Sequence, residues 1–133
     1  MYAVILGCGR VGGYVAGELS AQGHSVVVVD KDPEAFKDLP AGFSGFTLIR
    51  SASEFDALEE AKIADADLVV AATQDDNLNL MVASFARDLF GVKQVIARVV
   101  DPRTKAVGEA LGLAISCSTE LVGRDMMSQI KGD

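Results

Sequence analysis

The sequence predicts a doubly wound, parallel α/β sheet of six strands. Three observations lead to this prediction: apolar, β-branched runs typical of strands buried on both faces, amphipathic segments between them, and short connections bounded by Asp, Pro or Gly. Right-handed crossovers with a switch after the third strand predict the strand order 3-2-1-4-5-6. Ligands of such sheets bind at the carboxyl ends of the strands beside the switch point, here the first and fourth strands.

Strands and helices alternate along the whole chain. The expected strands are 2–6, 25–30, 46–49, 68–72, 94–100 and 113–117. The first expected helix begins at about residue 11, and the last follows Ser118. The four helices between them are expected at 33–39, 54–61, 77–90 and 102–111. These six units use all 133 residues, so we expect a single nucleotide-binding domain over residues 1–133, with no residues left for a substrate domain.

Capping residues set several of the helix boundaries. Asp32-Pro33 and Asp101-Pro102 each combine an N-cap side chain with a proline that suits the first helical position. Ser53 and Ser118 are expected to cap the third and the last helix in the same way. Gly91 is the expected C-terminal stop of the longest helix.

The composition excludes several classes of protein. Half of the residues are hydrophobic and 23% are charged, which excludes disorder. The net charge of −7 argues against a nucleic-acid partner, which requires a basic face. No apolar stretch approaches the ~20 residues of a membrane span, and the start has no cleavable leader, so we expect a cytoplasmic protein without membrane insertion. Two distant cysteines and one histidine predict no metal site.

A glycine-rich turn connects the first strand to the first helix. It reads Gly7-Cys8-Gly9-Arg10-Val11-Gly12, which is the G-x-G-x-x-G pattern of Rossmann-like nucleotide sites in its required context. Gly7 allows the tight turn, Gly9 leaves the backbone open to a pyrophosphate, and Gly12 lets the helix pack closely on the sheet. Free N–H groups at the helix start then face the phosphates. The alternative is a glycine turn that serves only packing.

Asp30 ends the second strand, where its carboxylate can accept hydrogen bonds from both hydroxyls of a ribose. The alternative role, capping the next helix, is already filled by Asp32. The same carboxylate would repel a 2′-phosphate by about 4 kcal/mol per charge pair at about 4 Å, so NADP is disfavoured. Lys31 either tempers that repulsion or points to solvent.

Four short motifs along the chain match the pattern of one known family. Residues 7–12 read G-x-G-R-x-G, residues 19–30 read L-x-x-x-G-H-x-V-x-V-x-D, residues 71–79 read A-x-T-x-x-D-x-x-N, and residues 96–99 read I-A-R-V. On these motifs, over nearly its full length, the chain resembles the N-terminal nucleotide-binding domain of potassium-transport regulators, called RCK-N, KTN or TrkA-N. The resemblance implies an adenine nucleotide as ligand, either NAD(H), ATP, ADP or AMP. It also implies a role in gating a membrane potassium channel or transporter.

The chain departs from that family in the loop after the third strand. The family usually has Gly-Asp-Ala where this chain has Arg50-Ser51-Ala52. The resemblance places this loop near the adenosine, so Ser51 and Ala52 are candidate contacts, the Asp contact is absent, and Arg50 is a weaker candidate for the adenosine side. Full regulators usually carry a further C-terminal subdomain, so this chain is either a stand-alone subunit or part of a longer regulator.

Three further residues are candidates for the ligand. Arg10, in the glycine turn, suits a phosphate through its guanidinium, or it is a solvated residue of the first helical turn. Arg98 lies within an apolar strand, where an unpaired charge is costly. It therefore forms an ion pair inside the fold, or it reaches the ligand or a neighbouring subunit. Thr73 ends the fourth strand at the cleft, where its backbone or hydroxyl can contact the ligand.

Other polar residues of these motifs are assigned to the fold itself. Asp76 and Asn79 are expected to cap or brace the long helix. Cys8 is expected to be a small residue in a crowded turn, and the alternative is a redox sensor whose pKa is lowered by the helix N-terminus. Met126 and Met127 of the last helix are expected to be packing residues, and the alternative is that this helix, apolar on two sides, docks a partner subunit.

The favoured function is therefore a regulatory, nucleotide-binding module without catalytic residues. Its expected partners are a membrane potassium channel or transporter subunit and further copies of itself, as a homodimer or a larger ring. The first alternative is the cofactor-binding half of an NAD-dependent oxidoreductase that lacks its catalytic domain. The second is an interaction domain that keeps the fold and has lost its ligand.

Overall fold

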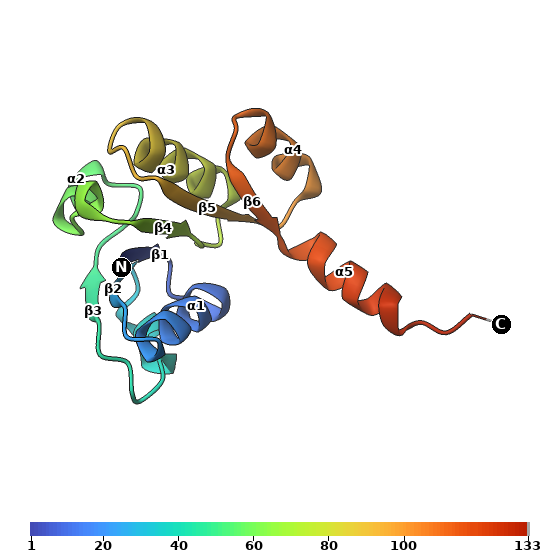
Figure 1. The fold of residues 1–133 in the computed structure, drawn as a ribbon, viewed down its shortest axis with the longest axis horizontal. Coiled ribbons are helices and arrows are strands. Elements are labelled where there is room, and N and C mark those ends of the chain that lie inside the picture. The colour runs from blue at the N-terminus through green and yellow to red at the C-terminus, as the bar shows by residue number, and fades with distance from the viewer. Residues whose placement is uncertain (133) are drawn as a thin grey trace.

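Residues 1–132 are described by the computed structural model (Figure 1). They contain one six-stranded sheet in the order β3-β2-β1-β4-β5-β6, in which every neighbouring pair is parallel. The strands are β1 (Tyr2–Leu6), β2 (Ser25–Asp30), β3 (Phe46–Ile49), β4 (Leu68–Ala71), β5 (Gln94–Val99) and β6 (Ala114–Cys117). The predicted fold class and strand order are confirmed.

Helical segments follow each strand, as the sequence predicts. They are α1 (Arg10–Ala21), η1 (Pro33–Asp38), α2 (Phe55–Glu60), η2 (Ile63–Asp65), α3 (Asp76–Asp88), α4 (Pro102–Ala110) and α5 (Ser118–Gln129). The segment after β2 is a 3₁₀-helix rather than an α-helix, and the short 3₁₀ turn η2 was not expected.

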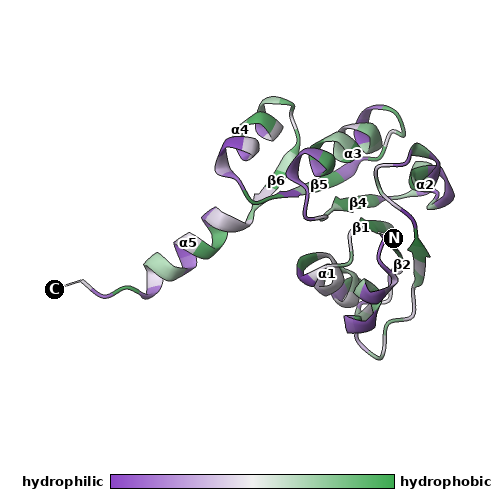
Figure 2. Cartoon of the chain, turned by 180° about the vertical axis from the view of Figure 1, so that it is seen from behind, coloured by the Kyte–Doolittle hydropathy of each residue, from purple (hydrophilic) through white to green (hydrophobic). Residues whose placement is uncertain are grey.

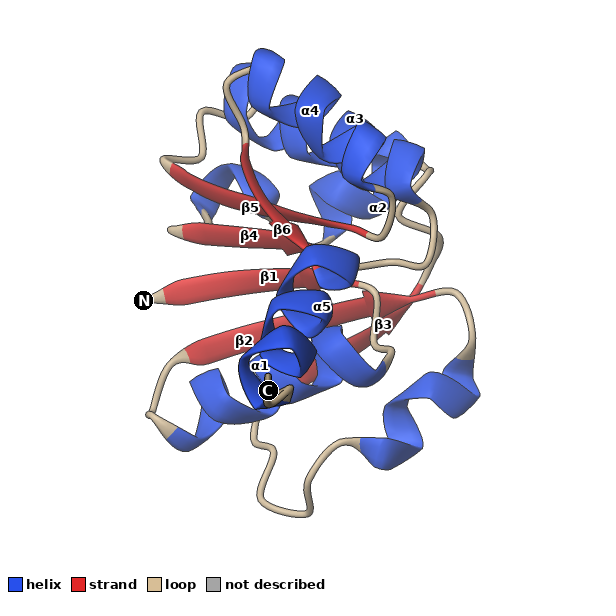
Figure 3. Cartoon of the chain, turned by 90° about the vertical axis from the view of Figure 1, so that its right-hand side faces the viewer, coloured by secondary structure: helices blue, strands red, loops and turns tan. Residues whose placement is uncertain are grey.

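The helices cover the two faces of the sheet unequally. α2, α3 and α4 lie on one face, and α1 with η1 lies on the other (Figure 3). Alternate residues of the central strand serve the two layers: Leu6 belongs to the core under α2 and α3, and Ile5 to the core under α1, both fully buried. Burial on both faces explains why the central strands are apolar at every position.

The aspartate caps are confirmed, and the serine caps are wrong. Asp32 accepts a hydrogen bond from the N–H of Glu34 (3.0 Å), and Asp101 accepts one from the N–H of Arg103 (2.8 Å). The N-cap of α2 is the residue after Ser53 and makes no side-chain cap, while Ser118 is already the first residue of α5. These two helices therefore begin without a serine cap.

The last helix projects away from the rest of the domain (Figures 1 and 2). None of the residues of α5 is buried, and its large apolar side chains are more than half exposed. They are Leu121, Val122, Met126 and Met127, followed by Ile130 beyond the helix end. Within the described chain, no helix combines the length and apolar character that crossing a membrane requires.

Candidate functional site

The turn after β1 is wedged between the ends of its neighbouring strands. Gly7 has φ +100°, and its N–H donates to the carbonyl oxygen of Val29 at 2.7 Å. A Cβ at Gly7 would lie 2.7 Å from the carbonyl oxygen of Ala72 and 2.8 Å from the nitrogen of Thr73. Both the backbone conformation and the crowding require glycine, which confirms the turn role predicted for this position.

The helix α1 begins at this turn, with Gly9 at its N-cap and no side chain capping it. A Cβ at Gly12 would lie 1.9 Å from the carbonyl oxygen of Gly7 and 3.5 Å from Cγ2 of Ile5 in β1, so the predicted close packing of the helix on the sheet is confirmed. A Cβ at Gly9 would meet no atom within 4 Å, so the backbone there is open. Because the first N–H groups of a helix have no acceptor within it, this open turn suits an anion.

Asp30 is bonded to the same turn. Its Oδ2 accepts a hydrogen bond from the N–H of Cys8 (2.8 Å), and its Oδ1 accepts one from the N–H of Asp32 (2.9 Å). A carboxylate has about four acceptor positions, so each oxygen keeps capacity for a hydroxyl. The carboxylate thus holds the glycine turn in place and remains able to bind a ribose.

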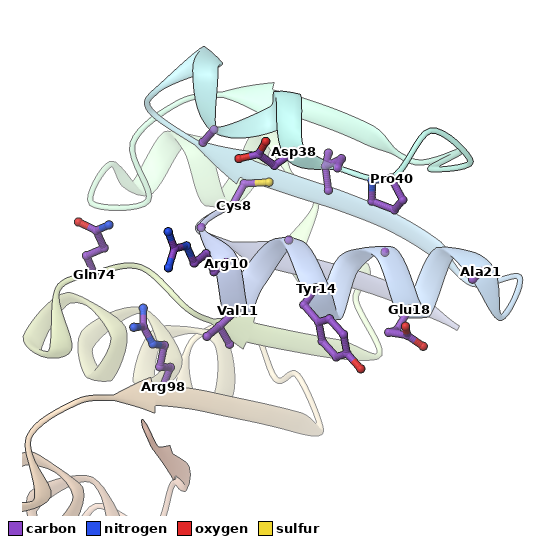
Figure 4. A pocket seen from close by; sticks show the side chains of 15 residues that line it. Cys8, Arg10, Val11, Tyr14, Glu18, Ala21, Asp38, Pro40, Gln74 and Arg98 are labelled. Atoms are coloured by element: carbon purple, nitrogen blue, oxygen red, sulfur yellow. The ribbon is translucent and has the colours of Figure 1, made fainter. Parts of the chain in front are cut away.

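Two hollows meet at the glycine turn. The first, which we call the strand-end pocket, has a volume of about 420 Å³ at the ends of β1, β2 and β4. Of the predicted site residues it is lined by Gly7, Gly9, Asp30, Lys31, Ser51, Ala52 and Thr73. The second, which we call the α1 groove, has a volume of about 1060 Å³ and runs along the outer side of α1 (Figure 4).

The α1 groove is lined by predicted residues from two elements. They are Cys8, Arg10 and Val11 of the glycine turn and Arg98 of β5, together with Gly9, which also lines the strand-end pocket. Gly12 lines neither hollow, because it faces the backbone of Gly7. Apart from Gly12, the predicted residues therefore line two adjoining hollows, with Asp30 in one and the guanidinium groups of Arg10 and Arg98 in the other.

Arg98 resolves an alternative that the sequence left open. Among the residues that the structure describes, no carboxylate lies within ion-pair distance of its guanidinium, so the internal ion pair is wrong. Its Nη1 donates to the carbonyl oxygen of Thr73 (3.2 Å), and its Nε is buried without a partner. The side chain lies in the α1 groove on the same side as Arg10 and Gln74 (Figure 4).

A comparison with protein families decides what kind of domain carries this site. The sequence model described as the TrkA-N domain matches residues 3–118. The chain belongs to the TrkA-N family.

Curated relatives of this TrkA-N domain are potassium-uptake proteins. The Trk system potassium uptake protein TrkA of Streptomyces coelicolor is 38% identical over 130 residues, which are 98% of this chain and 58% of that protein. The TrkA protein of Mycobacterium tuberculosis H37Rv is 33% identical over 120 residues, which are 90% of this chain and 54% of that protein. The chain thus spans little more than half the length of the curated relatives it matches.

Solved structures share the fold of this TrkA-N domain. The Kef CTD of Shewanella denitrificans in its AMP-bound form is 25% identical, with a TM-score of 0.82 over 95% of this chain and 77% of that one. The TrkA-N domain of the Escherichia coli inner membrane protein ybaL is 18% identical, with a TM-score of 0.85 over 98% and 96%. The GsuK channel bound to NAD is 21% identical, with a TM-score of 0.78 over 96% and 22%.

The loop after β3, where Arg50-Ser51-Ala52 replaces the usual Gly-Asp-Ala, divides its side chains between α2 and the strand-end pocket. Arg50 forms ion pairs with Glu54 (3.0 Å) and Glu60 (2.5 Å), so it is directed to α2 and lines neither hollow. The suggestion that it serves the adenosine side is wrong. Ser51 and Ala52 line the strand-end pocket, and their contact with an adenosine stays a prediction.

The thiol of Cys8 is not a reactive thiolate. Burial, together with the negative charges of Asp30 and Asp38, raises the pKa of Cys8 from 9.0 to about 11. The thiol is therefore protonated at neutral pH, and the alternative of a redox sensor with a lowered pKa is wrong. The side chain is a small, buried residue of the turn, as the preferred interpretation states.

The polar residues after β4 mainly stabilise the fold. Asp76 accepts hydrogen bonds from the N–H groups of Val100 (3.0 Å) and Asp101 (3.0 Å), which confirms its bracing role. The amide, carbonyl and hydroxyl of Thr73 all have partners within the fold. The sequence interpretation missed Gln74, which lines both hollows and could have been found from its place in the loop after β4, next to Thr73.

Proposed function

We propose that this TrkA-N domain binds an adenine nucleotide, either NAD(H), ATP, ADP or AMP, and that the bound state regulates a membrane potassium channel or transporter. The observation that carries the proposal is the carboxylate of Asp30, bonded to the open glycine turn at the end of the neighbouring strand. Support comes from relatives named as potassium-uptake proteins and from similar folds that hold AMP, ADP or NAD.

The two hollows divide a nucleotide between them. The ribose and base occupy the strand-end pocket, where Asp30 accepts the ribose hydroxyls and Lys31, Ser51, Ala52 and Thr73 form the walls. The phosphates lie on the backbone of the glycine turn and extend toward the guanidinium groups of the α1 groove. NADP binds poorly, because its 2′-phosphate would meet the Asp30 carboxylate.

Regulation is favoured over oxidoreductase chemistry. The curated relatives above are named as potassium-uptake proteins and not as redox enzymes. A bound nucleotide can act on a channel or transporter only through its different affinity for two conformations, typically about 1–3 kcal/mol of coupling. The domain does this at the cytoplasmic side of its membrane partner.

Assembly with a second copy gives α5 a place to dock. On the α1 side of the sheet, Ala114 and Ser116 of β6 are exposed, and no helix of the described chain covers them. In α5, Val122 and Met126 lie one turn apart and extend to Ile130, so one side of the helix is a continuous exposed apolar stripe. We propose that the α5 stripe of one copy covers this part of the sheet in another, forming a homodimer or a larger ring.

Nucleotide binding is tested directly by calorimetry with NAD, NADH, NADP, ATP, ADP and AMP. We expect binding of at least one of the five compounds other than NADP, a higher melting temperature in its presence, and weaker binding of NADP. If none of them binds at millimolar concentration, the proposed function fails and the domain is an interaction module that keeps only the fold.

The substitution Gly9→Ala separates binding from folding. The new Cβ meets no protein atom, so we expect a loss of stability below about 1 kcal/mol, in the range of an N-cap change. It stands where phosphates approach the backbone, so nucleotide affinity is expected to fall about tenfold or more. Adenosine, which has no phosphate, serves as the control and should bind equally well to both proteins. Equal nucleotide affinity in both proteins would remove the phosphates from this turn.

The substitution Met126→Asp tests assembly through α5. A charge in the middle of the apolar stripe is expected to convert dimers into monomers in sedimentation velocity, because burying it unpaired is costly. Ser128→Asp places the same charge on the opposite side of the helix and should leave the dimer intact. A wild-type domain that sediments as a monomer at high concentration would contradict the proposed assembly.

A further inference from the structure

Asn79 is a fully buried polar side chain with every hydrogen-bonding position in use. It lies in the first turns of α3, under the end of β4. Its Oδ1 accepts from the N–H (3.0 Å) and the hydroxyl (2.6 Å) of Thr73. Its Nδ2 donates to the carbonyl oxygens of Thr73 (3.0 Å) and Arg98 (2.8 Å). An amide has two donor and two acceptor positions, so no capacity is left for a ligand.

The two partners of Asn79 belong to the two different hollows of the site. Thr73 lines the strand-end pocket, and Arg98 lines the α1 groove. The carbonyl oxygen of Thr73 is shared, because it accepts from Asn79 and also from Nη1 of Arg98 (3.2 Å). One buried amide therefore fixes the loop after β4, the end of β5 and, through the shared carbonyl, one end of the Arg98 guanidinium.

The position of Arg98 depends strongly on this arrangement. Its Nε is buried without a partner, and the one hydrogen bond found for its guanidinium within the described chain is the one to Thr73. Removing the amide would leave the carbonyl oxygen of Arg98 itself without its side-chain donor. The strand end and the loop would then be free to separate, and the guanidinium would lose its direction toward the glycine turn.

We infer that Asn79 is a positioning residue for phosphate recognition: it orients Arg98 toward the phosphates while making no contact with the ligand. The inference rests on the proposed function, because it presumes a nucleotide at the glycine turn. It extends that function by explaining why a nucleotide should bind more tightly than its nucleoside: the hydrogen bonds of the buried Asn79 hold Arg98 where it can meet the phosphates. Asp30, which holds the ribose in the proposed function, makes no hydrogen bond with this network, and the network adjoins the strand-end pocket only through Thr73.

The substitution Asn79→Asp tests the inference with almost no change of size. The carboxyl group keeps an acceptor for Thr73, but an oxygen replaces the amide donor and faces two carbonyl oxygens. We expect the affinity for ADP to fall about tenfold, while the affinity for adenosine stays within about twofold. Both are measured by calorimetry. If the variant does not fold, Asn79→Ser, which keeps a hydroxyl but cannot reach both carbonyls, takes its place and is expected to show the same selective loss.

A double-mutant cycle with Arg98→Ala distinguishes positioning from general support of the fold. If Asn79 acts through Arg98, the double variant binds ADP no more weakly than Arg98→Ala alone, and the two losses are not additive. Additive losses, or a parallel loss of adenosine affinity in Asn79→Asp, would overturn the inference and leave Asn79 as part of the core only.

Ser20→Ala is the matched control. Ser20 is the other buried polar residue of the described chain, and its hydroxyl accepts from the N–H of Ser44 (3.1 Å), away from both Asp30 and Arg98. This variant should lose stability with an unchanged ratio of ADP to adenosine affinity. A wild-type domain that binds adenosine and ADP equally would overturn the inference alone, whereas one that binds neither of them nor any other nucleotide would overturn the proposed function with it.

Discussion

Replacing Asp30 with alanine is expected to weaken adenine-nucleotide binding by roughly 2–4 kcal/mol, since it removes two charge-assisted hydrogen bonds to the ribose. The same change takes away the acceptor for the N–H of Cys8, so the glycine turn loses one of its anchors. Calorimetry with ADP and with NAD measures the loss. The preference for NAD over NADP should shrink in the variant, because the charge that repels a 2′-phosphate is gone.

Asp67→Ala is the control for this experiment. Its carboxylate also accepts a hydrogen bond from a backbone N–H, that of Tyr2 at 2.7 Å, but at the opposite end of the strands. The variant loses the same type of bond and the same charge without touching the site. If Asp30→Ala keeps the wild-type affinity, or if both variants lose affinity equally, the ribose assignment is wrong.

The fold follows from the sequence because its determinants are local. Each strand of the sheet is an apolar run that periodicity alone locates within a residue or two, and the aspartates before α4 and η1 mark their starts directly. Serines are weaker signals, because their hydroxyls have other partners available. Ser53 shares a hydrogen bond with Ser51 at 2.6 Å and does not cap α2.

The site is predicted in part, and the missing part depends on distant residues. The glycine turn and Asp30 are readable because a strand, a turn and the next strand end must adjoin in a parallel sheet. The ion pairs of Arg50 with α2 and the link between Asn79 and Arg98 depend on how separate elements pack. No pattern in the sequence gives those contacts, so the side on which each arginine lies had to come from the structure.

The docking of α5 is a further case in which local pattern is insufficient. The helix itself is predicted correctly, and its apolar residues suggest a buried helix. The structure places it away from the sheet, with Met126 and Met127 exposed. An apolar pattern indicates that a surface is to be buried, but it does not say by which chain.

Gly12→Ala is expected to destabilise the domain by roughly 3 kcal/mol, at the upper end of what overpacking usually costs. The added Cβ would lie 1.9 Å from the carbonyl oxygen of Gly7, which is backbone on the crowded side of a turn. No side-chain rotation relieves such a contact, so α1 would have to move away from β1. Denaturant unfolding followed by circular dichroism measures the change, and nucleotide affinity should fall with it because the glycine turn moves.

Gly13→Ala, one residue further along the same helix, is expected to stabilise the domain rather than destabilise it. Its Cβ would lie 3.8 Å from Sγ of Cys8, an ordinary van der Waals distance, and alanine is favoured over glycine within a helix by roughly 0.5–1 kcal/mol. Both variants gain the same methyl group on the same helix. The difference between their stabilities therefore measures the clash with the Gly7 backbone, apart from the helix preference of alanine. If Gly12→Ala unfolds at the same denaturant concentration as Gly13→Ala, α1 can shift at little cost, and the contact between helix and turn does not hold the phosphate site in place.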